Sequence, residues 1–317
     1  MRTGDEYSLE HIRTWEFNNT FPIRSIAIPY VSIKIPFNYL RFLSMYIRYY
    51  LDIDMRNSYV LLVYPRLLMA LLSFVNDWSL YQICKSYTLK SEIRLITMAS
   101  SYVILVFGTR TFSNTFEMCL CSFLLYIVAE SMVHSNTVVF QLEFLQSKYE
   151  KAKSTVEKVK LYKMKASLPS HSYNKCFLIS TICVIGVFNR PTFLVFGLPI
   201  VFFWLTRGLG SKTVRFSEFN LRIGFLMLSA VPALFIFVFV DSLYYGYLSW
   251  EEIYTLDIGM DNFVVTPLNF IKYNINPENT GKHGLHSNYL HILVNIPLLY
   301  NILGVITIFS FGMMSYR

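Results

Sequence analysis

Charged residues are scarce in this sequence. Asp, Glu, Lys and Arg make up 15% of the 317 residues, whereas a soluble globular domain carries about 25%. Hydrophobic residues make up 54% of the chain and aromatic residues 17%. Because a chain so apolar and so poor in charge does not fit the soluble globular class, we predict an all-α, polytopic helical membrane protein.

Several chemical signatures are also missing. The sequence has no glycine-rich phosphate loop and no acidic pair spaced for a metal, so we expect neither a nucleotide nor a metal cofactor. No basic and aromatic pattern typical of nucleic-acid binding accompanies the net charge of +8, and the polar start MRTGDEYSLEHIRTWEF is no cleavable signal peptide. The five cysteines lack metal-ligand spacing, so we expect small core residues and no disulfide framework.

Apolar runs divide the chain into about seven predicted spans within one transmembrane domain that covers residues 1–317. The spans are predicted at residues 58–74, 93–108, 115–133, 176–188, 193–205, 222–240 and 290–313. Residues 1–58 are polar and aromatic, and the part at 26–50 alternates apolar and basic residues, which predicts short interfacial helices. Residues 76–92 form a predicted polar connection, and residues 134–175 a long hydrophilic loop with some helical spacing.

Lysine and arginine are concentrated in every second connection between these spans. The segments 76–92, 134–175 and 206–221 hold most of them, so the positive-inside rule places these segments in the cytosol. The remaining connections then face the lumen or the exterior. All the polar clusters that suggest a function fall on that second side: Asp5-Glu6, WEFNNTFPIRS (15–25), RTFSN (110–114), FNRPTF (188–193), DSLYYG (241–246) and HGLH (283–286).

These clusters suit transfer from a lipid phosphate to a hydroxyl. Arg110 and Arg190 stand at helix ends without acidic neighbours in sequence, and arginine grips phosphate with two hydrogen bonds. Asp241 or another carboxylate on this side could remove a proton, and His283 and His286 could donate to a leaving phosphate or to sugar hydroxyls. Each residue also has a structural interpretation: the arginines as snorkelling anchors, Asp241 as a helix cap and the histidines as loop residues.

Five stretches resemble the dolichyl-phosphate-mannose-dependent mannosyltransferases of glycosyltransferase family 22. They are WEFNNTFPIRS, RTFSNTFE, FNRPTF, VDSLYYG and TPLNFIKYNINPENTGKHGLHSNYLHILVNIP, and they are spread over nearly the whole chain in the family's order. The last stretch, with its HGLH string, is similar to the sequence of one branch of this family. That branch adds a fourth, α1,2-linked mannose to the trimannosyl GPI-anchor precursor in the endoplasmic reticulum. The resemblance implies a GT-C-like bundle with lumenal interfacial helices, an inverting reaction, and dolichyl phosphate mannose and the GPI glycolipid as partners.

The resemblance also implies site residues. The family's catalytic carboxylate lies in a His-Pro-Asp-Glu element after a first membrane helix, whereas here Thr3-Gly4 precedes Asp5-Glu6, so we expect the chain to start downstream of that element and to be truncated at both ends. Asp5 and Glu6 are the catalytic candidates of the chain itself. The residues that match motif positions, and that we expect to bind substrate, are Arg24, Arg110, Asn114, Glu117, Arg190, Asp241, His283 and His286.

Two other functions remain open at this level. The missing His-Pro-Asp-Glu element would also fit a truncated, non-catalytic membrane relative that binds lipid or a partner subunit. A transporter is less favoured, because the polar groups gather at helix ends on one side and no internal repeat pairs the two halves.

Overall fold

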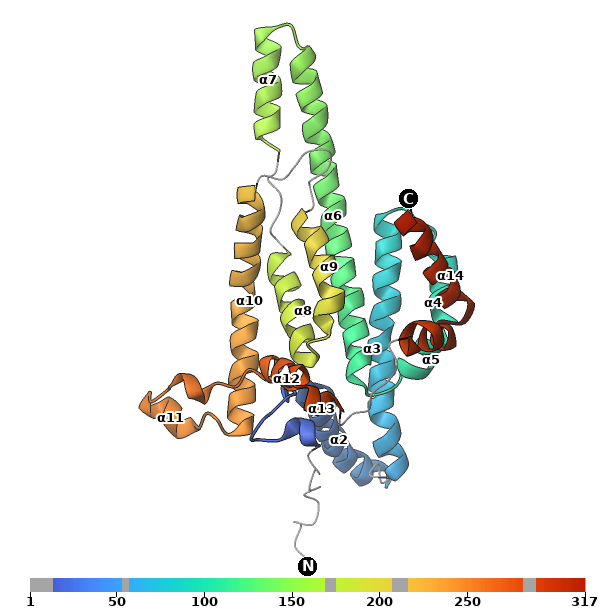
Figure 1. Ribbon diagram of the computed structural model, residues 1–317, viewed down its shortest axis with the longest axis vertical. Helices are drawn as coiled ribbons and strands as arrows, with labels where there is room; N and C mark the ends of the chain where they lie inside the picture. The colour runs from blue at the N-terminus through green and yellow to red at the C-terminus, as the bar shows by residue number, and fades with distance from the viewer. Residues whose placement is uncertain (1–13, 53–56, 169–174, 207–215, 282–288, 317) are drawn as a thin grey trace, which may run out of the picture.

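The computed structural model of the chain describes residues 14–52, 57–168, 175–206, 216–281 and 289–316, and within these ranges it contains no strand. Five helices run side by side as an elongated bundle (Figure 1): α3 (Ser58–Ser86), α6 (Ser113–Lys151), α8 (Cys176–Asn189), α9 (Phe193–Thr206) and α10 (Phe216–Tyr245). The predicted all-α class is confirmed.

The other elements lie at the two ends and one side of this bundle. The lower end in Figure 1, called the site end below, carries η1 (Trp15–Phe17), α1 (Ala27–Pro29), η2 (Tyr30–Lys34), α2 (Ile35–Leu51), α11 (Trp250–Thr255), η3 (Met260–Asn262), α12 (Thr266–Ile275) and α13 (Pro277–Gly281). The upper end, called the hairpin end, carries α7 (Thr155–Ala166). Beside α3 lie α4 (Glu92–Ala99), α5 (Tyr102–Phe107), η4 (Leu290–Asn295) and α14 (Ile296–Tyr316).

The best-packed core lies between α6, α8 and α9. Leu124 and Ile179 are fully buried there, and Trp204 fills the space beside them. The outer faces of α3 and α10 expose large apolar side chains such as Leu71 and Leu228. Within the described residues, three helices are long and apolar enough to cross a membrane, namely Ser58–Ser86, Ser113–Lys151 and Phe219–Tyr245, and α8 and α9 are shorter apolar helices. The bundle is therefore that of a multi-pass membrane protein whose outer faces contact lipid.

Two of the segments predicted between residues 76 and 108 differ from the structure. The polar connection predicted at 76–92 is wrong in its first part, because α3 continues through Ser86. Asn76 and Ser79 are buried, and the Asn76 amide donates to Cys119 Sγ of α6 at 3.6 Å, so these polar residues form a helix–helix contact. The single span predicted at 93–108 is also wrong, because α4 and α5 are two short helices separated at Ser100-Ser101.

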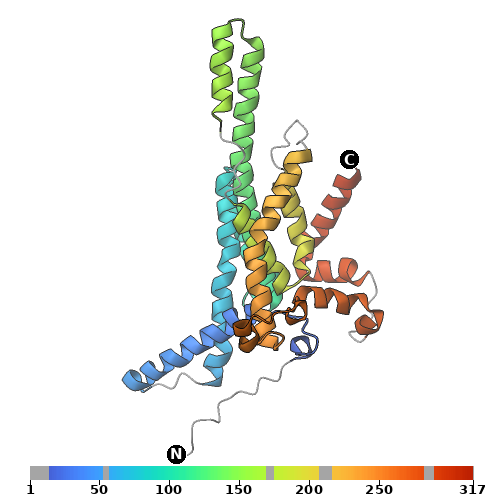
Figure 2. The same ribbon diagram turned by 90° about the vertical axis from the view of Figure 1, so that its left-hand side faces the viewer.

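The long hydrophilic loop predicted at 134–175 is in large part a helical hairpin. Helix α6 runs on to Lys151, and α7 folds back along it around Leu145, Ala152 and Leu161. Figures 1 and 2 both show this hairpin standing clear of the bundle along its long axis. At its base, Lys175 pairs with Glu130. The part of the prediction that gave this segment helical spacing is confirmed.

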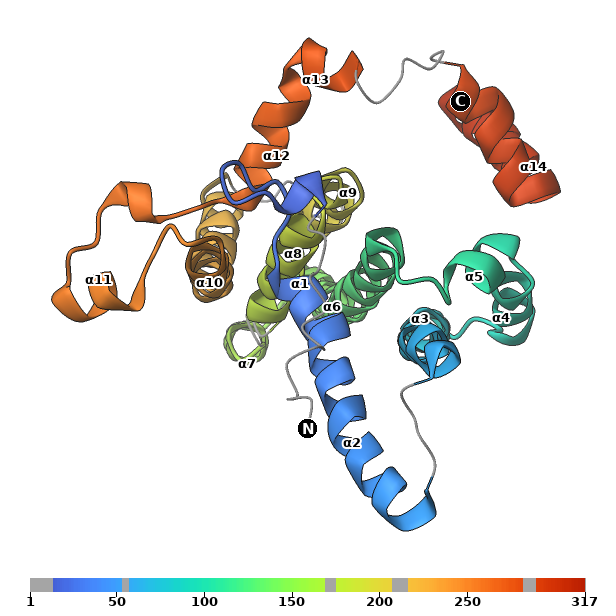
Figure 3. The same ribbon diagram turned by 90° about the horizontal axis from the view of Figure 1, so that it is seen from below.

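The helices that follow the first motif are longer than predicted. Residues 27–51 form one continuous run, in which α1 passes through the π-helical turn η2 into α2 (Figures 2 and 3). The π turn lies between Pro29, in the first turn of the run, and Pro36, which lies inside the run and cannot donate a helical hydrogen bond. The prediction of separate short helices is therefore wrong, although the run does lie at the end of the bundle.

One glycine allows α8 and α9 to meet closely beside the site. A Cβ atom on Gly186 would lie 2.4 Å from the ring of Phe193, whereas a Cβ atom on Gly224 of α10 would meet nothing within 4 Å. We expect Gly186→Ala to lower the free energy of unfolding by about 1–3 kcal/mol, because the ring is itself buried and has no room to move. Thermal unfolding in detergent measures this, and Gly224→Ala is the matched control. Equal stability of the two variants would contradict the close contact.

Candidate functional site

The site is built around Arg24, which enters from the segment between η1 and α1. Its Nη2 pairs with Glu16 Oε1 at 3.3 Å, and its Nη1 donates to the carbonyl oxygen of Asn189 at 3.3 Å. The guanidinium carbon also lies 5.5 Å from the ring centre of Phe270. The backbone is fixed as well, because the Tyr245 hydroxyl donates to the Arg24 carbonyl at 2.6 Å. Arg24 therefore has one well-defined position against the end of α8.

The turn after α8 places a second arginine beside the first. Asn189 Nδ2 donates to the carbonyl of Ser113 at 2.9 Å, and this bond ties the end of α8 to the start of α6. Arg190 follows directly and has its Nε buried without a hydrogen-bond partner among the described residues. Burial and the nearby Arg24 charge lower the pKa of Arg190, and Glu117 and Glu16 partly oppose that shift. Four charges, two of each sign, thus gather at this point.

The turn after α8 also holds Glu117 of α6 in this group. It lies in the first turns of α6 and is buried, and its Oε1 accepts a hydrogen bond from the Thr192 hydroxyl at 3.0 Å. The motifs RTFSNTFE and FNRPTF therefore meet in space, as their shared side of the membrane predicted. A charged residue so deeply buried needs such a partner, because an isolated carboxylate is costly to remove from water.

Asp241 has a different environment from the other predicted site residues. It is fully buried near the end of α10, and both of its carboxylate oxygens are used. Oδ1 accepts from Ser25 Oγ at 2.9 Å and from the backbone N–H of Ile26 at 3.1 Å, and Oδ2 accepts from Thr266 Oγ1 at 2.8 Å. Asp241 thus joins the segment directly after Arg24 to the start of α12.

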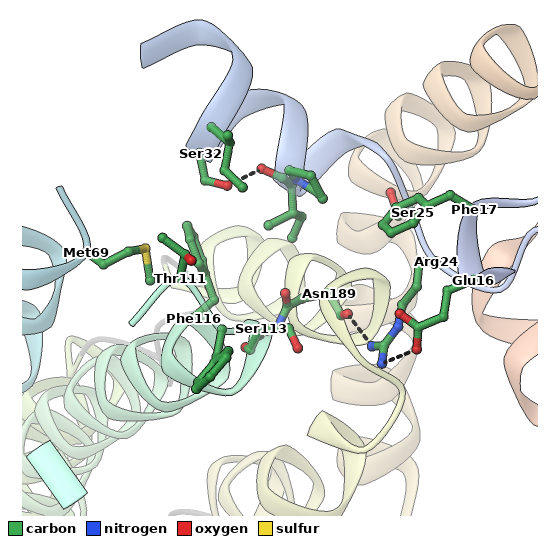
Figure 4. Close-up of a pocket in the computed structure, with 14 residues that line it drawn as sticks. Glu16, Phe17, Arg24, Ser25, Ser32, Met69, Thr111, Ser113, Phe116 and Asn189 are labelled. Carbon is green, nitrogen blue, oxygen red and sulfur yellow. Dashed lines mark hydrogen bonds and ion pairs between the residues drawn. The ribbon is translucent and has the colours of Figure 1, made fainter. Parts of the chain in front are cut away.

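A cavity of about 180 Å³ opens beside Arg24. Figure 4 shows Glu16, Arg24 and Asn189 together on one side of it and Met69 on the opposite side. The polar part of its lining comes from Glu16, Arg24, Ser25, Ser32, Thr111, Ser113 and Asn189. The rest comes from Phe17, Ile28, Pro29, Ile33, Met69, Phe112 and Phe116. One cavity therefore combines the Arg24–Glu16 ion pair on one side with a lining of both polar and apolar side chains.

The structure brings together some of the predicted site residues and leaves others apart. Arg24, Glu117 and Arg190 form one group, and Asp241 supports it. Arg110 and Asn114 are exposed, and of the predicted site residues that the structure describes only Arg24 lines the cavity. The catalytic candidates Asp5 and Glu6 and the histidines His283 and His286 lie outside the described residues.

Four contributors were missed by the sequence reasoning: Glu16, Ser113, Asn189 and Thr192. All four lie inside the quoted motifs, and the only signal in sequence was that three of them, Ser113, Asn189 and Thr192, lie within two positions of Asn114 or Arg190. Asn189 acts partly through its backbone carbonyl, which no residue type reveals.

Comparison with known proteins adds the family. The chain matches the model of the Alg9-like mannosyltransferase family over residues 6–317. It is 48% identical over 317 residues to GPI mannosyltransferase 4 of Drosophila melanogaster, and the match covers 100% of this chain and 46% of that protein. It is 30% identical over 302 residues to GPI alpha-1,2-mannosyltransferase 4 of Homo sapiens, covering 94% of this chain and 45% of that protein.

The chain thus spans about half the length of the curated relatives that it matches. No solved structure matches it. The match to the family model runs from the first described helix to the last and includes every motif of the site. The chain belongs to the Alg9-like mannosyltransferase family.

Proposed function

We propose that this chain, as a single transmembrane domain, forms the substrate face of an α1,2-mannosyltransferase. The proposed reaction moves mannose from dolichyl phosphate mannose to the trimannosyl GPI precursor as its fourth mannose. Relatives named GPI mannosyltransferase 4 and GPI alpha-1,2-mannosyltransferase 4 support this assignment. The structural observation that carries it is the pair Arg24 and Arg190, of which Arg24 lines a cavity with both polar and apolar side chains.

Such a cavity suits a lipid that ends in a phosphate. The guanidinium group of Arg24 lines the cavity and supplies a positive charge toward which a phosphate could be drawn. Ile33, Met69 and Phe116 line the apolar part, against which an isoprenoid tail could lie. A soluble anion would not need these apolar side chains. An arginine and apolar side chains in one cavity therefore favour a lipid-linked donor.

Arg190 is suited to the leaving phosphate. Arg24 already bonds to Glu16 and Asn189, whereas Arg190 Nε has no hydrogen-bond partner among the described residues. As the bond between mannose and phosphate breaks, negative charge grows on the phosphate. A positive group held in a water-poor site stabilises that charge more strongly than it would in water.

The acceptor hydroxyl needs a base, and Asp5 and Glu6 remain the proposed candidates. The carboxylate takes the proton of the acceptor 2-hydroxyl, and the oxygen attacks the anomeric carbon from the side opposite the phosphate. Dolichyl phosphate then leaves, and the configuration inverts. We propose that Glu117, His283 and His286 hold sugar hydroxyls, that Arg110 and Asn114 contact substrate at the rim, and that neither nucleotide nor metal takes part.

The proposed location is the endoplasmic reticulum membrane, with the site end in the lumen. The lysine-rich hairpin lies at the opposite end of the bundle, and the positive-inside rule assigns such a segment to the cytosol. The sequon Asn18-Asn19-Thr20 lies at the site end, and Asn18 and Thr20 are exposed, which fits the lumenal assignment.

Mannosyl transfer in microsomes tests the proposal. The chain is expressed in cells that lack their own fourth-mannose activity, and labelled dolichyl phosphate mannose is supplied as donor. We expect a four-mannose GPI lipid to form from the three-mannose lipid. Absence of product, with the chain present in the membrane and the donor intact, would contradict the transferase and favour a non-catalytic lipid-binding relative.

A further inference from the structure

An apolar arm projects from the site end of the bundle. It consists of residues 250–260, which follow α10 and include helix α11. Figures 1 and 3 both show it reaching sideways, away from α10 and from the other described helices. In Figure 1 it lies at the height of the lower part of α10. The arm is thus placed beside the last turns of a membrane-spanning helix.

The arm exposes large apolar side chains at almost every second position. Their exposed fractions are 61% for Trp250, 83% for Tyr254, 83% for Leu256, 42% for Ile258 and 91% for Met260. Trp250 and Tyr254 are four residues apart on α11 and so share one face of that helix. A soluble surface does not gather so many large apolar groups on one projection, and such a patch marks a surface that meets lipid or another protein.

The backbone segments on either side of the arm are held by hydrogen bonds. Asn262 Nδ2 donates to the Tyr247 carbonyl at 3.2 Å, and the backbone N–H of Val264 donates to Ser242 Oγ at 2.9 Å. A capping box between Ser249 and Glu252 starts α11. The apolar side chains are therefore presented by an ordered base, which fits a surface built for a constant neighbour.

The charged residues of the arm indicate which kind of lipid surface it can contact. Residues 249–262 contain four acidic residues, Glu251, Glu252, Asp257 and Asp261, and no lysine or arginine. The Glu252 carboxylate already accepts from the backbone N–H and the hydroxyl of Ser249, but Glu251, Asp257 and Asp261 are exposed. Exposed carboxylates need the polar headgroup layer, and they are repelled by anionic lipids.

We propose that the apolar arm lies in the interfacial layer of the leaflet at the site end and binds a zwitterionic lipid surface. Tryptophan and tyrosine are enriched at this depth of a bilayer, where an apolar ring can meet acyl chains and a polar atom can meet water. The position beside the last turns of α10 places the arm at that depth without any movement of the bundle. This inference does not depend on the proposed transferase activity.

A polarity-sensitive fluorophore on Met260→Cys tests the arm in the full chain, reconstituted in phosphatidylcholine bilayers. We expect blue-shifted emission and strong quenching by lipids that carry bromine on their acyl chains. Leu228→Cys, which is 69% exposed on α10, is the control for a lipid-facing position. Tyr162→Cys, which is 65% exposed on α7, is the control for a water-facing position. The unsubstituted chain measures background labelling of its five native cysteines.

Two results would overturn the proposal. If the label at Met260 resembles the label at Tyr162, the arm lies in water. If it is immobilised and reached by neither brominated lipid nor a water-soluble quencher, a protein surface covers it. A label on Tyr254→Cys gives an independent second position. We further expect anionic phosphatidylglycerol to reduce quenching at Met260 and to leave Leu228 unchanged, and equal quenching of Met260 in both bilayers would contradict selection by charge.

Discussion

Replacement of Arg190 by glutamine is expected to lower the rate of mannosyl transfer by about 100-fold or more, the usual effect of removing one group that stabilises charge in a transition state. Glutamine is shorter than arginine and retains some hydrogen bonding, but it removes the positive charge beside the leaving phosphate. Because that charge acts mainly as the phosphate departs, kcat should fall more than KM rises. Transfer from labelled donor at several donor concentrations separates the two constants.

A second substitution and a distant control sharpen this prediction. Arg190→Lys keeps the charge but loses the planar fork, so we expect activity between that of the glutamine variant and that of the unsubstituted chain. Arg94→Gln removes an arginine from α4, outside the site and its cavity, and should leave transfer unchanged. If Arg190→Gln and Arg94→Gln retained the same activity, Arg190 would be an anchor at the membrane surface, as the structural interpretation of its sequence position allows.

Replacement of Asp241 by alanine is expected to destabilise the fold by about 3 kcal/mol or more, since a buried donor that loses its acceptor costs about 1–3 kcal/mol. Three donors are affected, namely Ser25 Oγ, the Ile26 N–H and Thr266 Oγ1. Their acceptor joins segments that are far apart in the sequence, so the loss should loosen the whole site end. Thermal unfolding in detergent, followed by circular dichroism, measures the effect.

Two further variants separate the loss of acceptors from a general effect of charge. Asp241→Asn keeps one acceptor oxygen but places an amide donor opposite one of the three donors. The stability of this variant should therefore lie between that of Asp241→Ala and that of the unsubstituted chain. Asp261→Ala removes an exposed carboxylate, and we expect a change of less than about 0.5 kcal/mol. Equal shifts for Asp241→Ala and Asp261→Ala would show that the network around Asp241 adds nothing to stability.

The sequence predicted the apolar part of the fold well, because hydropathy reports directly on burial in lipid. The spans predicted at 176–188 and 193–205 differ from α8 and α9 by a single residue at one end. Prediction failed at 76–92, where Asn76 and Ser79 look like loop residues until α6 is placed against them. It failed again at 93–108, where a sufficiently apolar run is divided into two short helices. Composition reports how apolar a segment is, but not which neighbour accepts its polar atoms.

The site was predicted by grouping motifs on one side, and this grouping recovered Arg24, Glu117 and Arg190 as neighbours. The role of Asp241 could not be predicted in the same way, since a substrate carboxylate and a carboxylate that bonds to the chain itself look alike in sequence. Glu16 was missed for a related reason, because its importance depends on the fold that brings it to Arg24. The sequence allowed the site residues to be assigned to one side of the membrane, but it did not reveal their hydrogen-bond partners.

The segment that carries Arg24 also sets an order of events during synthesis. Its bonding partners Asp241, Tyr245 and Asn269 lie more than 200 positions later in the chain, with separations of 216, 221 and 247 residues for their bonds to Ser25, Arg24 and Pro22. At ordinary rates of translation, the ribosome needs on the order of tens of seconds to cover that distance. Throughout this interval the first motif is made but has none of these partners. The site therefore assembles only after α10 and α12 have been made, and a chaperone that shields residues 14–26 would act before then.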